Sequence, residues 1–203
     1  MVTQIKFKPW TGDDYDHALF GKRILVLGES HYGWVTGTPL DHCATFTIEQ
    51  IANQLDGRHP TKAFWTKIAG TFLNTYRPTP EEKCKFWRSV SFYNYVQQSP
   101  GEKSRISPTA DMFKASEPAF FEVLDLLKPE IVIVLGFRLW EKLPKQRPED
   151  EMLETEAGRI LTRHYSYPGG TCRAYAIKHP SSGFNSCKWH PHVMAFVRSN
   201  LAT

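Results

Sequence analysis

The apolar residues of this chain fall into short runs that end at a glycine or at polar residues. Residues 24–27 (ILVL) precede Gly28, and residues 131–135 (IVIVL) precede Gly136. Uninterrupted runs of this length, rich in β-branched residues, are typical of buried parallel strands rather than of helices. Two further strands are predicted over residues 89–96 (SVSFYNYV) and 173–180 (RAYAIKHP).

Helical patterns lie between these strands. Apolar residues recur every three or four positions over residues 61–76 and 116–127, as on the buried face of an amphipathic helix. Thr79, Pro80 and Glu82 form a capping-box sequence with proline in the first turn, which predicts that a helix begins there. A last helix is predicted from about residue 189 to residue 200.

Strands that alternate with helices predict an α/β protein. We expect a three-layer α/β/α sandwich with a short, mostly parallel central sheet, formed by residues 1–203 as a single domain. The polar stretches at residues 97–111 and 144–156 are expected to be surface loops. No run of about 18 apolar residues is present, so we expect no membrane partner.

Charge is distributed unevenly along the 203 residues, whose formal net charge is +4. Residues 157–203 contain six Lys or Arg and no Asp or Glu, whereas residues 1–156 contain 19 basic and 21 acidic residues. Basic side chains gathered in one part of a chain can form a face that binds a polyanion. The carboxy-terminal quarter therefore predicts a nucleic-acid-binding face.

Several other classes of function are disfavoured. The four cysteines form no CxxC pair and the amino terminus lacks the pattern of a secretory signal, so we expect a reduced, cytoplasmic protein. His164, His190 and His192 have no paired motif, so no metal site is expected. The glycines form neither a dinucleotide-binding nor a P-loop sequence.

Polar residues follow four of the predicted strands directly. Residues 28–33 (GESHYG) follow the first strand, and Asn94, Gly136 and His179 lie at the ends of the others. The carboxyl ends of parallel strands meet at one edge of a sheet, where ligands of α/β proteins bind. We therefore expect these residues to line one cleft.

These segments, in this order, resemble the motifs of the uracil-DNA glycosylase superfamily. GESHYG is similar to its first motif (GQDPYH or GEAPG), and residues 59–73 (HPTKAFWTKIAGTFL) resemble a segment of the mismatch-specific branch. Residues 126–143 and 179–184 (HPSSGF) are similar to its later strand and its closing motif. The resemblance, from about residue 23 to 189, implies a monofunctional glycosylase that needs no cofactor, flips uracil or a related damaged pyrimidine out of DNA and hydrolyses its N-glycosidic bond.

The resemblance also implies roles for individual residues. Glu29 or His31 would orient the attacking water, and His179 would donate a hydrogen bond to the departing base. Asn94 would read the edge of the base. The other residues of the base pocket would be Gly28, Ser30, Tyr32 and a stacking aromatic residue, either Trp34 or Phe46.

The closing motif would bind DNA. The residues proposed to contact its backbone are Lys178, Ser181, Ser182 and Lys188. Phe184 would enter the space left by the flipped base. Simpler interpretations stay open, since His179 and Ser181 could cap a helix and Phe184 could be a core residue of the last helix.

Two departures from the first motif bear on activity. Ser30 stands where several branches have Asp or Asn, and His31 stands where proline is usual. No cysteine lies directly before Glu117, so the iron–sulfur cluster of some branches is not expected. We expect a monomer. Two alternatives remain: a catalytically weak or silent member that binds DNA or a modified base, and a hydrolase of free nucleosides.

Overall fold

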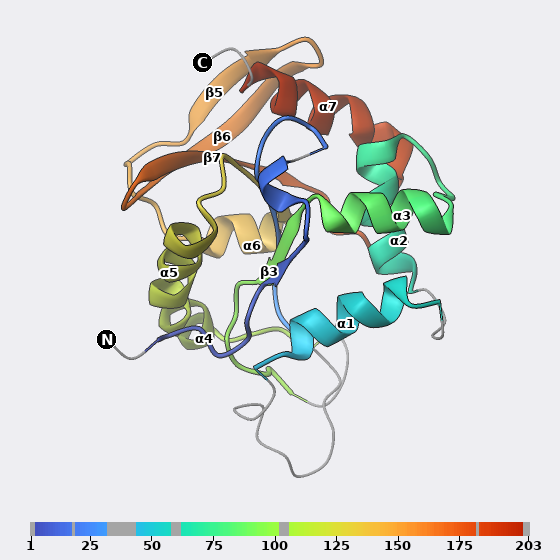
Figure 1. The fold of residues 1–203 in the computed structure, drawn as a ribbon. Coiled ribbons are helices and arrows are strands. Elements are labelled where there is room, and N and C mark those ends of the chain that lie inside the picture. Colours follow the sequence, from blue (N-terminus) through green and yellow to red (C-terminus); the bar gives the residue numbers. More distant parts are fainter. Residues whose placement is uncertain are drawn as a thin grey trace.

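The computed structural model describes residues 3–17, 19–31, 44–57, 62–101, 106–181 and 183–200. Its centre is one seven-stranded sheet with the order β1-β3-β2-β4-β7-β6-β5 (Figure 1). The strands are β1 (Trp10–Thr11), β2 (Ile24–Gly28), β3 (Ser91–Asn94), β4 (Ile131–Leu135), β5 (Glu151–Thr155), β6 (Gly158–Tyr167) and β7 (Gly170–Ile177).

The four central strands β3, β2, β4 and β7 run parallel to one another. Val26 of β2 lies opposite Phe92 on one side and Ile133 on the other. The remaining pairings, of β1 with β3, β6 with β7 and β5 with β6, are antiparallel. The α/β class is confirmed, but the sheet is parallel only at its centre.

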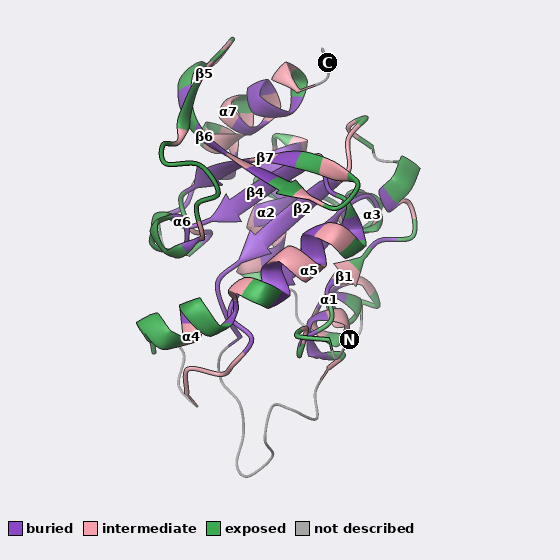
Figure 2. Ribbon diagram, turned by 90° about the vertical axis from the view of Figure 1, so that its left-hand side faces the viewer, coloured by how far each residue is buried: buried purple, intermediate pink, exposed green. Residues whose placement is uncertain are grey.

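Helices cover both faces of the sheet (Figure 1). One buried apolar cluster joins the sheet to α1, α2, α3 and α7, and a second joins the opposite face to α4, α5 and α6. Strands β2 and β4 lie buried between these two layers (Figure 2). The helices are α1 (Phe46–Leu55), α2 (Ala63–Leu73), α3 (Pro80–Arg88), α4 (Ala110–Ala115), α5 (Glu117–Leu127), α6 (Phe137–Lys142) and α7 (Ser186–Ser199), with a 3-10 turn at Tyr15–His17.

The helix starts follow local chemistry. The Thr79 hydroxyl accepts a hydrogen bond from the Glu82 backbone N–H at 3.2 Å, and the Glu82 carboxylate accepts one from the Thr79 N–H at 2.8 Å, so the expected capping box is confirmed. Helix α7 begins at Ser186, three residues earlier than expected, because the Asn185 side chain accepts a hydrogen bond from the Lys188 N–H. No helix of the described ranges is long and apolar enough to cross a membrane.

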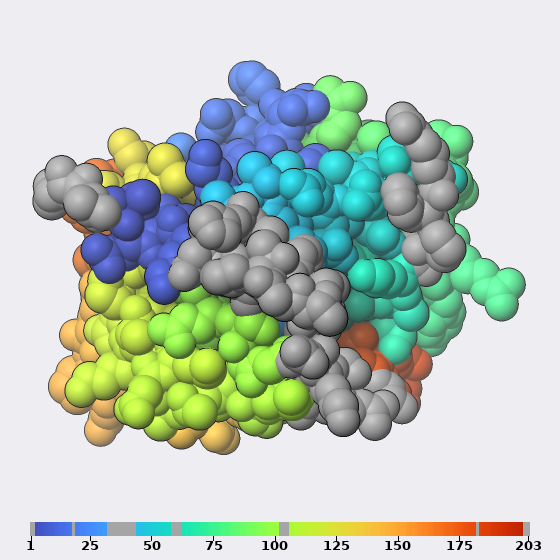
Figure 3. Space-filling model, turned by 90° about the horizontal axis from the view of Figure 1, so that it is seen from below, coloured from blue at the N-terminus to red at the C-terminus, as the bar shows by residue number. Residues whose placement is uncertain are grey.

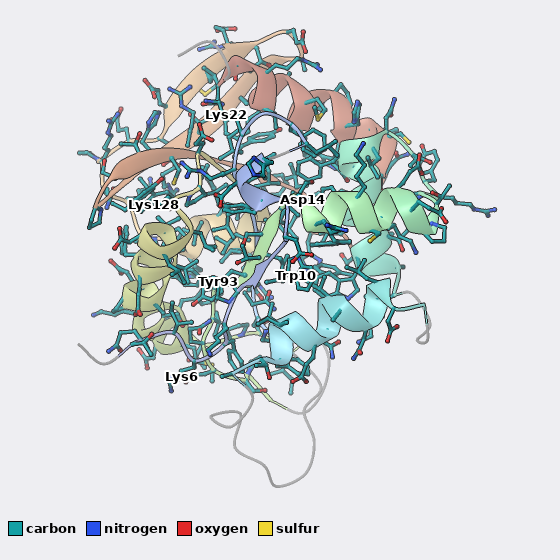
Figure 4. The ribbon with its side chains drawn as sticks, in the orientation of Figure 1. Lys6, Trp10, Asp14, Lys22, Tyr93 and Lys128 are labelled. Carbon is teal, nitrogen blue, oxygen red and sulfur yellow. The ribbon has the colours of Figure 1, made fainter. Side chains whose placement is uncertain are left out.

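At the amino ends of β2 and β4, a single carboxylate ties the two strands together. Glu130 accepts hydrogen bonds from the Lys22 ammonium at 2.8 Å and from the Arg23 backbone N–H at 3.0 Å. Figure 4 labels Lys22 at this upper end of the molecule and Lys6 near the lower end. The candidate polar residues lie at the other, carboxyl ends of the strands.

The loop expected over residues 144–156 is wrong in its second half. Residues Glu151–Thr155 form β5, which pairs with β6 in a hairpin that the sequence pattern did not predict. Strand β5 exposes Glu151 and Glu154 and β6 exposes Arg159, because β5 is an edge strand and the hairpin has solvent beside it. A charged edge strand lacks the apolar run by which the central strands were recognised.

This hairpin also corrects the expected basic face. The acids of residues 150–156 lie beside four of the six basic residues of the carboxy-terminal quarter. The pairs are Arg159 with Glu154, Arg163 with Asp150, Arg173 with Glu151, and Arg198 with Glu156. The charge asymmetry of the sequence is therefore largely neutralised on folding, and Lys178 and Lys188 are the two exposed cations of that set without a described ion pair.

One of these pairs is buried and anchors the hairpin. The Arg163 guanidinium is 4% exposed, donates to both Asp150 carboxylate oxygens at 2.6 and 2.8 Å, and donates to the carbonyl oxygens of Trp140 and Leu143. Its guanidinium carbon lies 4.3 Å from the centre of the Trp140 ring. Arg163 thereby joins the hairpin to the end of α6.

We expect Asp150→Ala to lower the free energy of unfolding by about 3 kcal/mol, because it leaves a buried guanidinium without its counter-ion. Urea unfolding followed by circular dichroism measures the change. The matched control is Glu154→Ala, which removes the acid of an exposed pair on the same hairpin and should cost less than about 1 kcal/mol. Equal losses in the two variants would contradict the anchoring role of Arg163.

Candidate functional site

The carboxyl ends of the four parallel strands open toward the underside of the molecule. Around this face lie α1 (cyan), the amino-terminal segment (dark blue) and the chain around α4 (yellow-green) in Figure 3. Glu29, Ser30 and His31 follow β2, Asn94 ends β3, and His179 follows β7. The topology thus brings the chemically distinctive residues of the sequence to one edge of the sheet.

Gly28 and Asn94 pack tightly against each other at this edge. The two residues lie opposite each other in the parallel register of β2 and β3. A Cβ atom on residue 28 would lie 2.2 Å from Asn94 Oδ1 and 2.9 Å from the Phe92 ring. Glycine is required here because only a residue without a side chain leaves room for the amide of Asn94.

The Asn94 amide is held against His31. Asn94 Nδ2 lies 3.0 Å from His31 Nδ1 and 3.3 Å from Nε2, and Nε2 also lies 2.9 Å from the Thr47 hydroxyl. The amide nitrogen can only donate, whereas the Thr47 hydroxyl can donate or accept, so these contacts suit a neutral imidazole in either tautomer. The amide and the hydroxyl together surround the nitrogen-bearing edge of the ring.

The surroundings of His31 are otherwise apolar. Its ring meets Phe7 and Phe46 edge to face, with centroid distances of 4.9 and 4.8 Å. Burial lowers the pKa of His31 to about 3, because a charged imidazole would lose its hydration there. His31 is therefore neutral throughout the physiological pH range.

Glu29 points to a different neighbour. The two nitrogens Nε and Nη2 of Arg138 donate to the two oxygens of the Glu29 carboxylate, with an Nε–Oε2 distance of 2.8 Å. Arg138 also donates from Nη1 to the Ser107 hydroxyl. The carboxylate is 7% exposed and the guanidinium 50% exposed, so this bidentate pair runs from the buried strand end to the surface.

His179 lies within electrostatic range of this pair. Burial lowers the pKa of His179, Arg138 and Lys67 lower it further, and Glu29 opposes them. The His179 ring packs against the Phe64 ring with a centroid distance of 5.5 Å. Gly136 is also close, since a Cβ atom added to it would lie 3.4 Å from the Cβ of His179. Glu29 and His179 thus form one half of the site, and Asn94, His31 and Thr47 form the other.

Ser30 lies between these halves in sequence and has a buried hydroxyl. Its side-chain oxygen has no hydrogen-bond partner among the described residues, although the residue is only 8% exposed, and the same holds for the hydroxyls of Tyr15 and Tyr93. A buried hydroxyl without a partner costs free energy, which a bound water or ligand would relieve. The binding role of Ser30 stays a prediction.

The residues of the closing motif are divided between surface and core. Lys178, Ser181 and Lys188 are exposed, and the Lys67 ammonium donates to the Ser181 carbonyl at 2.6 Å. Phe184 is only 8% exposed, belongs to the core cluster and stacks on Trp189 with nearly parallel rings. It does not project from the surface, as a residue that enters a DNA stack would. Tyr32, Trp34 and Ser182 lie outside the described residues.

Three residues of this site, Arg138, Thr47 and Lys67, were not predicted from the sequence. Arg138 carried a usable signal, because a cation in the first turn of a helix faces the positive end of the helix dipole and needs a nearby acid to compensate. Thr47 and Lys67 lie on helical segments and carried no such signal.

A separate groove of about 520 Å³ lies between α6 and α7 over β6 and β7, and it contains none of the candidate residues. Within the described ranges, no group of three or more His, Cys, Asp or Glu side chains is placed to hold a metal ion. Comparison of the sequence with profiles of known protein families and with curated protein sequences found no match.

The buried His31 predicts a pH-dependent stability. Its pKa is about 3 in the folded protein and about 6.5 in the unfolded chain, so protons bind preferentially to the unfolded chain between these values. The free energy of unfolding should fall as the pH drops below 6.5, by up to about 1.4 kcal/mol per pH unit from this residue.

Urea unfolding between pH 4.5 and 7.5 measures this slope. We expect His31→Gln to make the slope shallower, leaving the part due to His164 and His179, whose pKa values burial also lowers. His17→Gln, a change of an exposed histidine, should leave the slope unchanged. If wild type and His31→Gln gave parallel curves, His31 would not be the buried neutral group described above.

Proposed function

We propose that this protein is a DNA glycosylase that hydrolyses the N-glycosidic bond of uracil or a related damaged pyrimidine flipped out of DNA. One observation carries the proposal: a buried carboxylate, Glu29, lies within electrostatic range of a half-buried imidazole, His179, at the same edge of the sheet as Asn94. The resemblance of the four strand-end motifs to the uracil-DNA glycosylase superfamily supports the same reaction.

The reaction separates charge, and the two halves of this pair match the two charges. As the bond between C1′ and the base nitrogen breaks, its electron pair leaves with the base while positive charge develops on the sugar. Glu29 would hold the attacking water and stabilise the sugar cation. The water oxygen then bonds to C1′, and its proton passes through the Glu29 carboxylate to solvent.

His179 would act on the departing base. Since burial lowers its pKa below the ordinary value of 6.5, it is neutral at pH 7 and acts as a hydrogen-bond donor rather than as a cation. A ring N–H directed at a carbonyl oxygen of the base gains strength as negative charge builds on that oxygen. This differential stabilisation is what accelerates bond cleavage.

Arg138 would position the carboxylate. Two parallel N–H···O bonds fix both the distance and the plane of the Glu29 carboxylate, and the contact with Ser107 steadies the guanidinium itself. A rigid carboxylate can hold a water molecule in one attacking direction. Arg138 therefore acts through Glu29 and is a positioning residue.

The exposed residues around His179 would bind the DNA backbone. Lys178 and Lys188 flank the 179–184 motif, and Ser181 adds an exposed hydroxyl, while its backbone N–H donates to the His179 carbonyl at 2.7 Å. Such contacts hold the strand in register without reading its sequence.

A second candidate is the hydrolysis of free nucleosides or other small N-glycosides. Two observations favour it: four of the six carboxy-terminal basic residues are paired with acids, and Phe184 is buried in the core. The same Glu29 and His179 chemistry would serve this smaller substrate without a DNA-binding face.

We expect wild-type protein to form abasic sites in a uracil-containing oligonucleotide, and Glu29→Gln and His179→Ala each to slow this by at least about 100-fold. Product is measured by alkaline cleavage and gel electrophoresis of single strands and of duplexes with guanine or adenine opposite uracil. The matched controls are Glu149→Gln and His17→Ala, which change exposed residues. Uracil-DNA that is bound but never cleaved by the wild type would contradict catalysis and favour a binding protein.

Charge reversal separates the two candidate substrates. The double variant Lys178→Glu/Lys188→Glu should weaken cleavage of DNA most strongly at low salt, because phosphate contacts depend on ionic strength. Release of uracil from free deoxyuridine should be unchanged. An equal effect on both substrates, or none on DNA cleavage, would argue against a DNA-binding role for these lysines.

A further inference from the structure

The groups that the proposed function assigns to the base are already in contact with a ring of the protein itself. Asn94, expected to read the base, donates to His31, and Phe46, a candidate for stacking on the base, meets the same ring at 4.8 Å. The Thr47 hydroxyl lies 2.9 Å from Nε2 of that ring. His31 is only 8% exposed, so these neighbours enclose most of the ring.

The contacts of His31 are those that a nucleobase would make. An imidazole, like a pyrimidine base, is a flat ring with a hydrogen-bond donor and an acceptor on its edge; in uracil the donor is N3–H and the acceptors are carbonyl oxygens. Here the Asn94 amide nitrogen lies 3.0 and 3.3 Å from the two ring nitrogens, the Thr47 hydroxyl lies 2.9 Å from Nε2, and the rings of Phe7 and Phe46 meet the imidazole edge to face. The site therefore offers an amide donor, a hydroxyl and apolar walls to a neutral heteroaromatic ring.

Simple core packing does not require these polar groups. Asn94, His31 and Thr47 lie among apolar residues of the β2–β3–α1 region, where apolar side chains at all three positions would fill the same space without desolvating an amide, an imidazole and a hydroxyl. The neighbouring Ser30 has a buried hydroxyl without a hydrogen-bond partner among the described residues. Residues 30 and 31 therefore both place polar groups in a buried position.

We infer that the His31 ring occupies the base-binding position, and that His31 determines specificity because a substrate base reaches Asn94 only when this ring has moved away. The inference rests on the proposed function in naming the ligand as a nucleobase. A free base can bind only those molecules in which the His31 ring has left the site. Its apparent affinity is therefore the intrinsic affinity multiplied by the fraction of molecules in that state. Removal of the ring should therefore create a site that binds heteroaromatic rings directly.

The test is ring binding by His31→Ala. Imidazole should raise the Tm of His31→Ala by a few degrees and leave that of the wild type unchanged, because a ligand that binds only the folded state stabilises it. Free uracil should bind His31→Ala at least tenfold more tightly than wild type by isothermal titration calorimetry. Adding Asn94→Ala to this variant should weaken uracil binding about tenfold, because the amide donor is lost.

A matched cavity serves as the control. Leu124→Ala removes a buried side chain from the opposite face of the sheet and leaves a cavity with apolar walls, which should bind neither imidazole nor uracil. If His31→Ala bound both rings no better than Leu124→Ala, His31 would be an ordinary core residue and the inference would be overturned.

A second measurement does not depend on the stability of the alanine variant. In wild-type protein labelled with ¹⁵N-histidine, millimolar free uracil should shift the ring nitrogen signals of His31 and leave those of the exposed His17 in place. Unchanged His31 signals at saturating uracil would also overturn the inference. Base binding by His31→Ala without abasic-site formation by the wild type would support this site while refuting the glycosylase activity, so the two failures are distinguishable.

Discussion

The close approach of β2 and β3 at Gly28 is the constraint on which the site depends. Because residue 28 has no side chain, the Asn94 amide lies against the backbone of β2, and hydrogen bonds from the N–H groups of Tyr95 and Val96 to the carbonyls of Gly28 and Glu29 carry the parallel pairing past the strand ends. This extension fixes the backbone direction at Glu29, so that its carboxylate meets Arg138 while His31 meets Asn94. A bulkier residue 28 would disturb both halves of the site together.

The core of the fold could be predicted from the sequence because its strands are buried on both faces. Residues 24–27 and 131–135 are apolar without interruption, and such runs have few alternative structures. The hairpin of β5 and β6 could not be predicted in this way, since its edge position allows charged side chains on an exposed face. Its attachment to the end of α6 depends on contacts such as Arg163 with Asp150, which no local pattern reveals.

The position of the site was predictable for the same reason as the core, but its contacts were not. Strand ends that carry Glu29, Asn94 and His179 gather at one edge in any parallel sheet with these neighbours. The hydrogen-bond partners of these side chains come from helices elsewhere in the chain. Arg138, the partner of Glu29, lies on α6, and Thr47, a partner of His31, lies on α1. Sequence reasoning therefore located the polar groups without revealing that His31 and Asn94 bind each other.

The acids of β5 have a consequence for how the protein behaves at high concentration. Strand β5 is the outermost strand of the sheet, and an exposed edge of this kind can pair with the same edge of another molecule. Glu151 and Glu154 place negative charge along that edge while they neutralise arginines of neighbouring strands. Engineering that replaced these acids to strengthen attraction to nucleic acid would also remove a barrier to aggregation, so affinity and solubility are linked through the same few carboxylates.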